Sequence, residues 1–423
     1  MEVSHTVWIE GENEDDNQKV EEKSEISTKQ KQSYIPVPRE KSAWILVQLL
    51  LNYRVLNNPA AHGPKEWQHQ VPTTEETGYI SVDYAMIGAT LEDDPISLKE
   101  AKERSDWPKL KEAMDAKMDQ LTKRGMYKLV ELPPDCKAIA SKWVFHIKRD
   151  HNGKIVKYKA RLVAKGFSQI PGIDFVETFA PVMRLETFRL LMALATKLGL
   201  LIHVVDVVGA YFNGTLQETI YMAQPPDCDN STGRVSLLIK ALYRLRQAGQ
   251  AWNNELNQSF LELEYTRLFS DQCVYIHHQE CDLILAIIHT DDITMLGSDI
   301  DAIKKAKAEL GKYFTITDLG EAKQVVGLEL ERNLEEGTLK LSQTQYIQRT
   351  LEKFGMADSH PVSTPLDPNV KLIKLPSMEH YDIPDYRSAI GSLIYVAIGT
   401  RPDISFAVQH LSQFMTSGKI LLS

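Results

Sequence analysis

Residues 282–298 read DLILAIIHTDDITMLGS, an apolar run interrupted in the middle by two adjacent aspartates, Asp291 and Asp292. The apolar stretch before it, CVYIHH at 273–278, is suited to pair with it as a neighbouring strand. A carboxylate beside an apolar strand is costly to bury unless it is paired or binds a cation. This stretch therefore predicts paired strands with an acidic site between them.

A third carboxylate stands in a similar place. Residues 200–207 read LLIHVVDV, so Asp206 comes at the end of another apolar strand. Three such carboxylates from separate strands could hold two Mg²⁺ ions, which prefer carboxylate oxygens. Ions held ~3.5–4 Å apart would activate a hydroxyl and stabilise a leaving phosphate oxygen. The alternative is an acidic hairpin turn at Asp291-Asp292 and a strand-end cap at Asp206, and spacing alone favours that alternative because short motifs recur by chance.

The sequence around these strands mixes helices and strands irregularly. Asn152-Gly153 predicts a hairpin turn between strands at 141–149 and 155–167. A second hairpin is predicted over 325–343. Apolar residues at spacings of three and four predict helices over 98–121, 184–199, 241–263 and 300–314. This order predicts an α+β fold rather than a regular βαβ alternation.

Charge is distributed unevenly along the chain. The 423 residues carry a net charge of −9, but residues 1–30 alone hold nine acids and three lysines, a net −6. We expect a disordered acidic tail, because this segment is also poor in large apolar groups, within a disordered or weakly ordered part covering 1–95. Residues 141–170 hold eight basic residues and one acid. This basic patch is suited to a nucleic-acid partner.

Composition restricts the class and compartment. With 43% hydrophobic and 25% charged residues, and apolar runs well short of the ~20 residues of a membrane-spanning helix, we expect no membrane crossing. The acidic N-terminus lacks the pattern of a secretion signal, so we expect an intracellular, cytoplasmic protein. The four cysteines are too scattered for a disulfide framework. Cys273, His277 or His278, and Cys281 offer three zinc ligands without a fourth nearby, which disfavours a zinc site.

Several longer blocks occur in one order along the chain. They are KARLVAKGFSQIPGIDFVETFAPVMRLETFRLLMAL (159–194), DVVGAYFNGTLQETIYMAQPP (206–226), LIKALYRLRQAGQAWN (238–253), HTDD (289–292), FTITDLGEAKQVVGLELER (314–332) and LSQTQYIQRTLEKFGMADSHPVSTPLDP (341–368). Together they resemble the reverse transcriptase of copia-type LTR retrotransposons, collinearly from about Trp107 to Phe414. The resemblance implies a right-hand polymerase with fingers, palm and thumb over 96–366. It also implies that 367–423 is a truncated connection segment leading toward an absent RNase H domain, in a fragment of a pol polyprotein.

The resemblance also implies roles for particular residues. Asp206 matches the first catalytic aspartate of the family, and Asp291 and Asp292 match its paired aspartates, so these three are the expected catalytic residues and metal ligands. Nucleotide-binding roles are implied for Arg161, Lys165, Tyr211 and Gln247. Without the resemblance, Tyr211 is equally well a core aromatic, and Arg161 and Lys165 a solvated strand face.

Tyr211 would lie beneath the sugar of the incoming nucleotide. It comes five residues after Asp206, so the two share no face of a regular strand or helix. The chain must turn between them, and Gly209 supplies the conformational freedom for that turn.

The implied activity is RNA-directed DNA polymerisation, in which a primer 3′-hydroxyl attacks the α-phosphate of a deoxynucleoside triphosphate. Two Mg²⁺ ions, with Mn²⁺ as a substitute, would be the cofactors. The partners would be an RNA template, a DNA or RNA primer, deoxynucleoside triphosphates and other retroelement proteins. Backbone contacts from the basic patch would hold template and primer without reading sequence.

Departures from the family pattern, together with the absent RNase H domain, favour a second hypothesis, a catalytically dead or weakened retroelement remnant that at most binds nucleic acid. The aspartates follow His289-Thr290, where the family most often has a bulky residue before Val. Arg244 replaces a usual Gly, and Gln250 replaces an Arg. A long side chain at a position suited to Gly could distort the nucleotide pocket.

Overall fold

The computed structural model describes residues 7–10, 94–149, 154–228, 232–279, 282–367, 372–374, 384–415 and 420–422. The chain divides into two compact units that interleave along the sequence. The first comprises Met1–Ala89, Leu185–Ile202 and Glu321–Ser423, and the second Thr90–Arg184 and His203–Gly320. The predicted acidic tail lies outside the described residues except for 7–10, and the boundaries predicted after residues 95 and 366 stay predictions.

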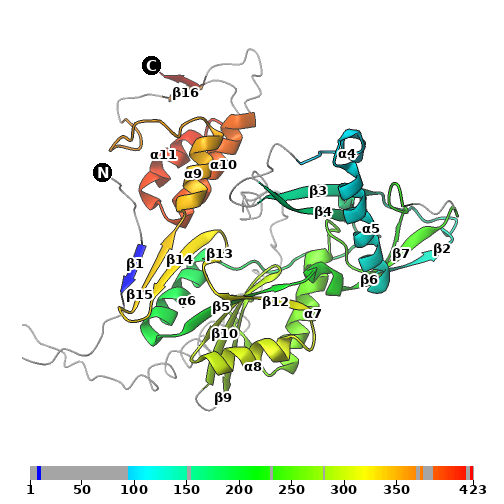
Figure 1. Cartoon of the computed structure of the whole chain (residues 1–423), viewed down its shortest axis with the longest axis horizontal. Coiled ribbons are helices and arrows are strands. Elements are labelled where there is room, and N and C mark those ends of the chain that lie inside the picture. The colour runs from blue at the N-terminus through cyan, green and yellow to red at the C-terminus, as the bar shows by residue number, and fades with distance from the viewer. Residues whose placement is uncertain are drawn as a thin grey trace, which may run out of the picture. The chain divides into compact units, whose positions relative to one another are not determined.

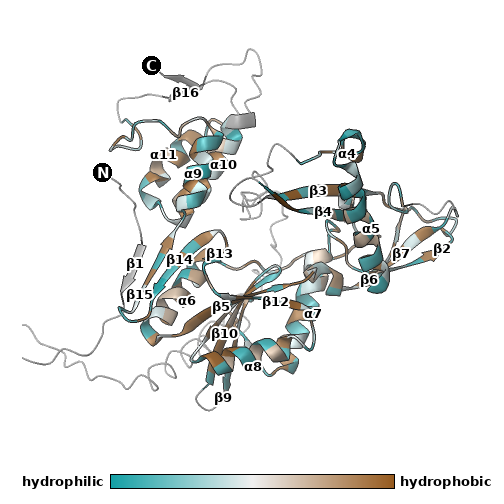
Figure 2. Ribbon diagram, viewed as in Figure 1, coloured by the Kyte–Doolittle hydropathy of each residue, from teal (hydrophilic) through white to brown (hydrophobic). Residues whose placement is uncertain are grey.

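A six-stranded sheet forms the main framework of the second unit (Figure 1). Its strands, in spatial order, are β12 (Ile316–Glu321), β5 (Leu201–Val207), β11 (Asp292–Gly297), β10 (Asp282–His289), β9 (Val274–Gln279) and β8 (Thr266–Arg267). Residues 283–288 of β10 are all buried, as expected for a strand covered on both faces. Helix α8 (Ile300–Leu310), which the Asp299 carboxylate caps, packs against β10 and β11. Figure 2 shows mostly brown strands here and a helix α8 of mixed polarity.

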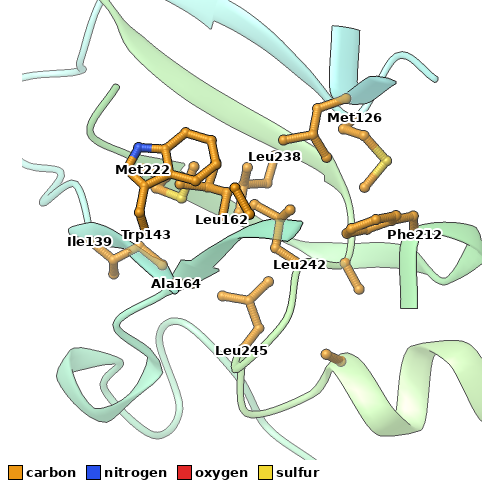
Figure 3. Close-up of a cluster of buried hydrophobic side chains, with 14 of the residues drawn as sticks. Met126, Ile139, Trp143, Leu162, Ala164, Phe212, Met222, Leu238, Leu242 and Leu245 are labelled. Carbon is orange, nitrogen blue, oxygen red and sulfur yellow. The ribbon is translucent and has the colours of Figure 1, made fainter. Parts of the chain in front are cut away.

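The second unit also contains a separate core built from short sheets and one long helix. The hairpin of β3 (Ser141–Arg149) and β4 (Ile155–Ala164) and the sheet of β2 (Tyr127–Val130), β7 (Val235–Lys240) and β6 (Thr215–Met222) contribute to one buried cluster. Helix α5 (Trp107–Lys123) closes it through Leu110, Met114 and Leu121. Figure 3 shows the side chains converging, with Phe212 at one end. The hairpin predicted from Asn152-Gly153 is confirmed in its strands, while the turn itself lies outside the described residues.

The helix predicted over 98–121 is two helices. Helix α4 (Leu98–Glu103) begins at Ser97, whose side chain accepts a hydrogen bond from the Glu100 amide, and the chain breaks before α5. Asp106 is the N-cap residue of α5, with Pro108 in the first turn, as the sequence indicates. Its carboxylate does not cap the helix, however, because it binds the Arg104 guanidinium at 2.9 Å. That local pair stabilises the break.

The first unit contains helix α6 and a four-stranded sheet. Helix α6 (Leu185–Leu198) confirms the helix predicted over 184–199, and Gly199, with φ +65°, ends it in the left-handed conformation that glycine commonly adopts there. The sheet order is β1 (Val7–Glu10), β15 (Thr338–Ser342), β14 (Leu328–Asn333) and β13 (Gln324–Val325), and α6 packs against β1 and β15. The remaining helices are α9 (Thr344–Lys353), α10 (Pro384–Gly399) and α11 (Ser405–Ser412).

Helices and strands are thus mixed in both units, which confirms the coarse class predicted from the sequence. Among the described helices, none combines the length and the apolar character needed to cross a lipid bilayer.

Candidate active site

The six-stranded sheet gathers the three aspartates at one place. In the β10–β11 hairpin His289 pairs with Asp292, so Thr290 and Asp291 form a two-residue turn. The Val207 amide at the end of β5 donates a hydrogen bond to the Asp291 carbonyl at 2.8 Å. Asp206, the residue before Val207, therefore lies beside the turn. Residues more than eighty positions apart in the sequence meet because β5 and β11 are neighbours in the sheet.

Burial and mutual repulsion disfavour the ionised forms of the paired aspartates. Burial and the charges of Asp291 and Asp206 raise the pKa of Asp292 from its usual 3.8 to about 6. Burial, and then the charge of Asp206, also raise the pKa of Asp291. A cation between these groups would relieve this unfavourable charge. Their oxygen donors suit a hard divalent ion, although no three metal-ligating side chains in the described part of the chain are arranged as a ready ligand set.

The raised pKa of Asp292 predicts that Asp292→Asn stabilises the metal-free protein at neutral pH. A carboxyl group whose pKa rises on folding stabilises the folded state at pH values below its pKa in the unfolded state. That contribution is lost as the pH rises through its pKa in the folded state. The wild type should lose it between about pH 4 and pH 6, whereas the amide does not titrate. After allowance for solvent screening we expect roughly 1 kcal/mol, or about 2–4 °C in Tm at pH 7.5.

Thermal melts in EDTA at pH 4 and pH 7.5 measure this difference. The Tm of Asp292→Asn should exceed that of the wild type at pH 7.5 and equal it at pH 4. Equal Tm values at both pH values would show that folding does not raise the pKa of Asp292.

Trp252 anchors the aspartate turn. Helix α7 (Ala248–Glu262) carries this buried residue, and its indole Nε1 donates a hydrogen bond to the Thr290 carbonyl at 2.7 Å. Its ring also packs edge-on against Phe314, with centroids 5.0 Å apart. Thr290 has φ +58°, a conformation uncommon for a β-branched residue, and the indole contact holds it there. The sequence analysis did not identify this anchor.

The predicted turn at Gly209 is confirmed. Gly209 has φ +67°, and a Cβ atom there would come within 2.6 Å of the Phe212 ring. The chain then forms the short 3₁₀ helix η3 (Ala210–Asn213), which buries Phe212 and leaves Tyr211 half-buried. The turn thus carries the chain from Asp206 to Tyr211 within five residues.

Tyr243 is a site residue that the sequence analysis missed. Its ring packs edge-on against both Tyr211 and Phe212, with centroids 5.1 Å apart in each pair. Burial and the charges of Asp291 and Asp206 raise its pKa, and Arg161 and Arg124 act in the opposite direction. The phenol is therefore subject to the charges of both the carboxylates and the basic residues. Only its position directly after the apolar Ala241-Leu242 could have drawn attention to it.

Strand β4 contributes basic residues to the same region. The charge of Arg161 acts on the Tyr243 phenol, and Lys159 lies on the same strand face two residues earlier. The nucleotide-binding role predicted for Arg161 stays a prediction. The charges of Asp206 and Asp291 act on Lys159 and partly offset the lowering of its pKa by burial and Arg161. Lys165 directly follows the strand, and its backbone amide donates a hydrogen bond to the Ala140 carbonyl at 2.8 Å. Its predicted nucleotide contact stays a prediction.

Gln247 holds the surrounding loops together. It is 2% exposed, its side-chain oxygen accepts a hydrogen bond from Gln169 at 3.1 Å, and its amide nitrogen donates to the Asp174 carbonyl at 2.9 Å. The nearby Arg246 amide donates to the Gln169 oxygen. These bonds join the loop before α7 to the segment after β4. The predicted nucleotide contact of Gln247 stays a prediction, and its side chain already has protein partners.

The zinc alternative gains no support from the residues that the structure describes. Cys273 is buried, and burial raises the pKa of its thiol to about 12, which disfavours the thiolate that binds zinc. The His277 ring lies against Tyr265 at 4.9 Å, and Cys281 is outside the described residues.

Comparison with known proteins identifies the family. Residues 124–368 match the family model described as reverse transcriptase (RNA-dependent DNA polymerase). The chain therefore belongs to the reverse transcriptase family.

The relatives are Pol polyproteins of retrotransposons, which confirms the copia-type resemblance. The chain is 39% identical over 353 residues to the retrovirus-related Pol polyprotein from transposon TNT 1-94 of Nicotiana tabacum, covering 81% of this chain and 26% of the relative. It is 34% identical over 354 residues to that from transposon RE1 of Arabidopsis thaliana, covering 82% and 24%. The chain thus spans about a quarter of the length of these relatives.

Among solved structures, the chain is similar to a foamy viral protease-reverse transcriptase in complex with double-stranded DNA. The TM-score is 0.36 at 10% identity, covering 74% of this chain and 45% of the other. The family assignment rests on the sequence matches.

Proposed function

We propose that this chain is an RNA-directed DNA polymerase that extends a primer on an RNA template. The observation that carries the proposal is the meeting of Asp206 and the Asp291-Asp292 turn at one place in the sheet. Aromatic and basic side chains surround that place, as a nucleotide substrate requires. Membership of the reverse transcriptase family supports the same chemistry.

The proposed architecture is that of a right hand. The six-stranded sheet with α7 and α8 would be the palm, since it carries the aspartates. The β3–β4 hairpin, with its basic strand face, would belong to the fingers, and the thumb would come from later residues up to about 366. Backbone contacts from the basic patch at 141–170 would hold template and primer.

Asp206, Asp291 and Asp292 would hold two Mg²⁺ ions, or Mn²⁺ in their place. When bound, such ions activate the primer hydroxyl and stabilise the leaving oxygen. Arg161 and Lys159 would neutralise charge on the phosphates of the nucleotide, because both reach the region of the aspartates. Tyr211 would support the sugar, with its ring held by Tyr243.

A primer-extension assay tests this function. The full chain, a labelled primer annealed to an RNA template, and deoxynucleoside triphosphates should give extended products with Mg²⁺ and none with EDTA. An electrophoretic binding assay on the same duplex runs alongside. Binding without extension in either Mg²⁺ or Mn²⁺ would contradict polymerase activity.

Arg244 favours a second candidate, a weakened remnant that binds nucleic acid. It has φ +68°, a conformation that costs a non-glycine residue about 1–2 kcal/mol. Its backbone also lies against Gly166, where a Cβ atom would collide with the Arg244 carbonyl oxygen. The strained residue is adjacent to Tyr243, so strain there can displace the phenol.

Under this second candidate, Arg244→Gly should restore activity. We expect primer extension to rise about tenfold or more, together with a gain of about 0.5–1 kcal/mol in stability once the added unfolded-state entropy of glycine is subtracted. Glu264→Gly, which relieves a φ of +62° just after α7, is the matched control. If the wild type already extends primers strongly and Arg244→Gly leaves the extension rate unchanged, the hypothesis of a weakened remnant is wrong.

A further inference from the structure

The aspartate turn has a backbone conformation that its own sequence disfavours. Thr290 opens the two-residue turn between β10 and β11, and its φ of +58° lies in the left-handed region. A hairpin turn with a positive φ at its first central residue favours glycine there, because a Cβ atom crowds the following carbonyl group. Thr290 carries a β-branched side chain, which makes this conformation still less favourable. The turn therefore needs support from outside the hairpin.

The indole of Trp252 supplies that support. Its Nε1 donates a hydrogen bond to the Thr290 carbonyl at 2.7 Å, and the residue is only 3% exposed. An indole has a single donor and no acceptor, so this bond satisfies the whole hydrogen-bonding capacity of the buried side chain. Turning the Thr290 carbonyl away would leave a buried N–H group without a partner, which is costly. The indole and the turn therefore fix one another.

Trp252 is itself held in place by two contacts that do not involve the turn. Its ring packs edge-on against the buried Phe314, with centroids 5.0 Å apart. The backbone of α7 also lies directly against Gly214, the residue that ends η3. A Cβ atom at Gly214 would come within 2.7 Å of the Trp252 amide nitrogen. Packing against β12 and η3 thus sets the place from which the indole reaches the turn.

The supported turn is also bonded to the strand that carries Asp206. The Val207 amide donates a hydrogen bond to the Asp291 carbonyl at 2.8 Å. The next amide along the chain donates to the Thr315 carbonyl at 2.9 Å, in the residue after the phenylalanine that Trp252 contacts. The chain after Asp206 is thus bonded both to the turn that Trp252 holds and to the segment against which Trp252 packs.

We infer that Trp252 is a positioning residue for metal binding: its indole holds the turn in the conformation in which Asp206, Asp291 and Asp292 can share divalent cations. This inference rests on the proposed function and deepens it. An indole has no lone pair to offer a metal ion, so Trp252 orients the ligands through the Thr290 carbonyl. It acts on the aspartates as the outer partners of metal ligands do in other metal sites.

Binding of Mn²⁺ alone to the full chain, followed by electron paramagnetic resonance of the free ion, tests this role without requiring catalysis. Trp252→Phe keeps a ring against Phe314 and removes only the indole donor. The affinity for Mn²⁺ should fall by about 10–100-fold, the range typical when a group that orients metal ligands is removed.

Trp143→Phe is the matched control. Trp143 lies in the same unit, is likewise 3% exposed, and donates its indole hydrogen bond to the Pro226 carbonyl at 3.0 Å. It belongs to the separate core that α5 closes. Its substitution should lower the Tm by about as much as Trp252→Phe does, and change the affinity for Mn²⁺ by less than about twofold.

Thr290→Gly separates positioning of the turn from a general loss of packing. Glycine adopts a positive φ without a Cβ penalty, so a turn with glycine depends less on the indole. In the Thr290→Gly background, Trp252→Phe should therefore weaken Mn²⁺ binding by less than about threefold. A purely structural tryptophan would give the same loss in both backgrounds, because the two substitutions would then be independent.

Hydrogen exchange of the Val207 amide gives a readout in the metal-free protein. This amide bonds the Asp291 carbonyl, so its exchange should rise about tenfold in Trp252→Phe and stay unchanged in Trp143→Phe. Unchanged exchange and Mn²⁺ affinity in a folded Trp252→Phe protein, or an equal loss of affinity in Trp143→Phe, would overturn the inference. A chain that shows both expected effects but does not extend primers would contradict the polymerase and retain the positioning role.

Discussion

Asp291→Asn should reduce primer extension by about a thousandfold or more while the protein remains folded. Removing one ligand charge from the aspartate cluster forfeits several kcal/mol of transition-state stabilisation, and each 1.36 kcal/mol is a factor of ten in rate. The fold should survive because burial and the charge of Asp206 already disfavour the ionised Asp291. Steady-state and single-turnover extension rates measure the loss.

Asp282→Asn is the matched control for this substitution. Asp282 begins β10, at the opposite end of the strand from the aspartate turn. Its substitution should leave the extension rate within about twofold of the wild type, since it lies away from the site. Undiminished extension by Asp291→Asn would refute the catalytic assignment of the turn.

The second large effect concerns sugar selectivity. Tyr211→Ala should raise the ratio of ribonucleotide to deoxynucleotide incorporation by about 10–100-fold, the range expected when a steric contact with one small group is removed. The half-buried ring is held edge-on by Tyr243, so it occupies a defined place at the turn that follows Asp206. Competition between the two nucleotides, analysed by the products of single incorporation, gives the ratio directly.

Tyr211→Phe separates the ring from its hydroxyl and should keep the wild-type ratio. If Tyr211 is only a core aromatic, Tyr211→Ala instead lowers the melting temperature, and the ratio stays constant. If a folded Tyr211→Ala protein keeps the wild-type ratio of ribonucleotide to deoxynucleotide incorporation, the proposed steric contact of Tyr211 with the sugar is wrong.

Elements with strong local patterns could be predicted from the sequence. The β3–β4 hairpin and the strands around the aspartates follow from alternation and turn residues, and the turn at Gly209 follows from spacing and the freedom of glycine. The pairing of the Asp106 carboxylate with Arg104 could not, because an aspartate at the start of a helix usually caps the first turn instead.

Residues whose roles depend on distant partners were also beyond the sequence. Tyr243 and Trp252 act through contacts with Tyr211 and Thr290, which no local period encodes. Gln247 was predicted to bind the nucleotide from its sequence block alone. Its side chain forms hydrogen bonds with residues about 75 positions earlier in the chain.

The interleaving of the two units has a consequence during synthesis. Helix α6, with Phe188, Leu191 and Met192 buried on its apolar side, packs against β15, which the ribosome produces only with residues 338–342. Translation proceeds at about 5–20 residues per second, so the apolar side of α6 lacks this partner for on the order of ten seconds. A nascent chain paused before β15, or one cut there, would present α6 to chaperones and proteases, so the time taken to translate 199–342 governs how much protein escapes aggregation.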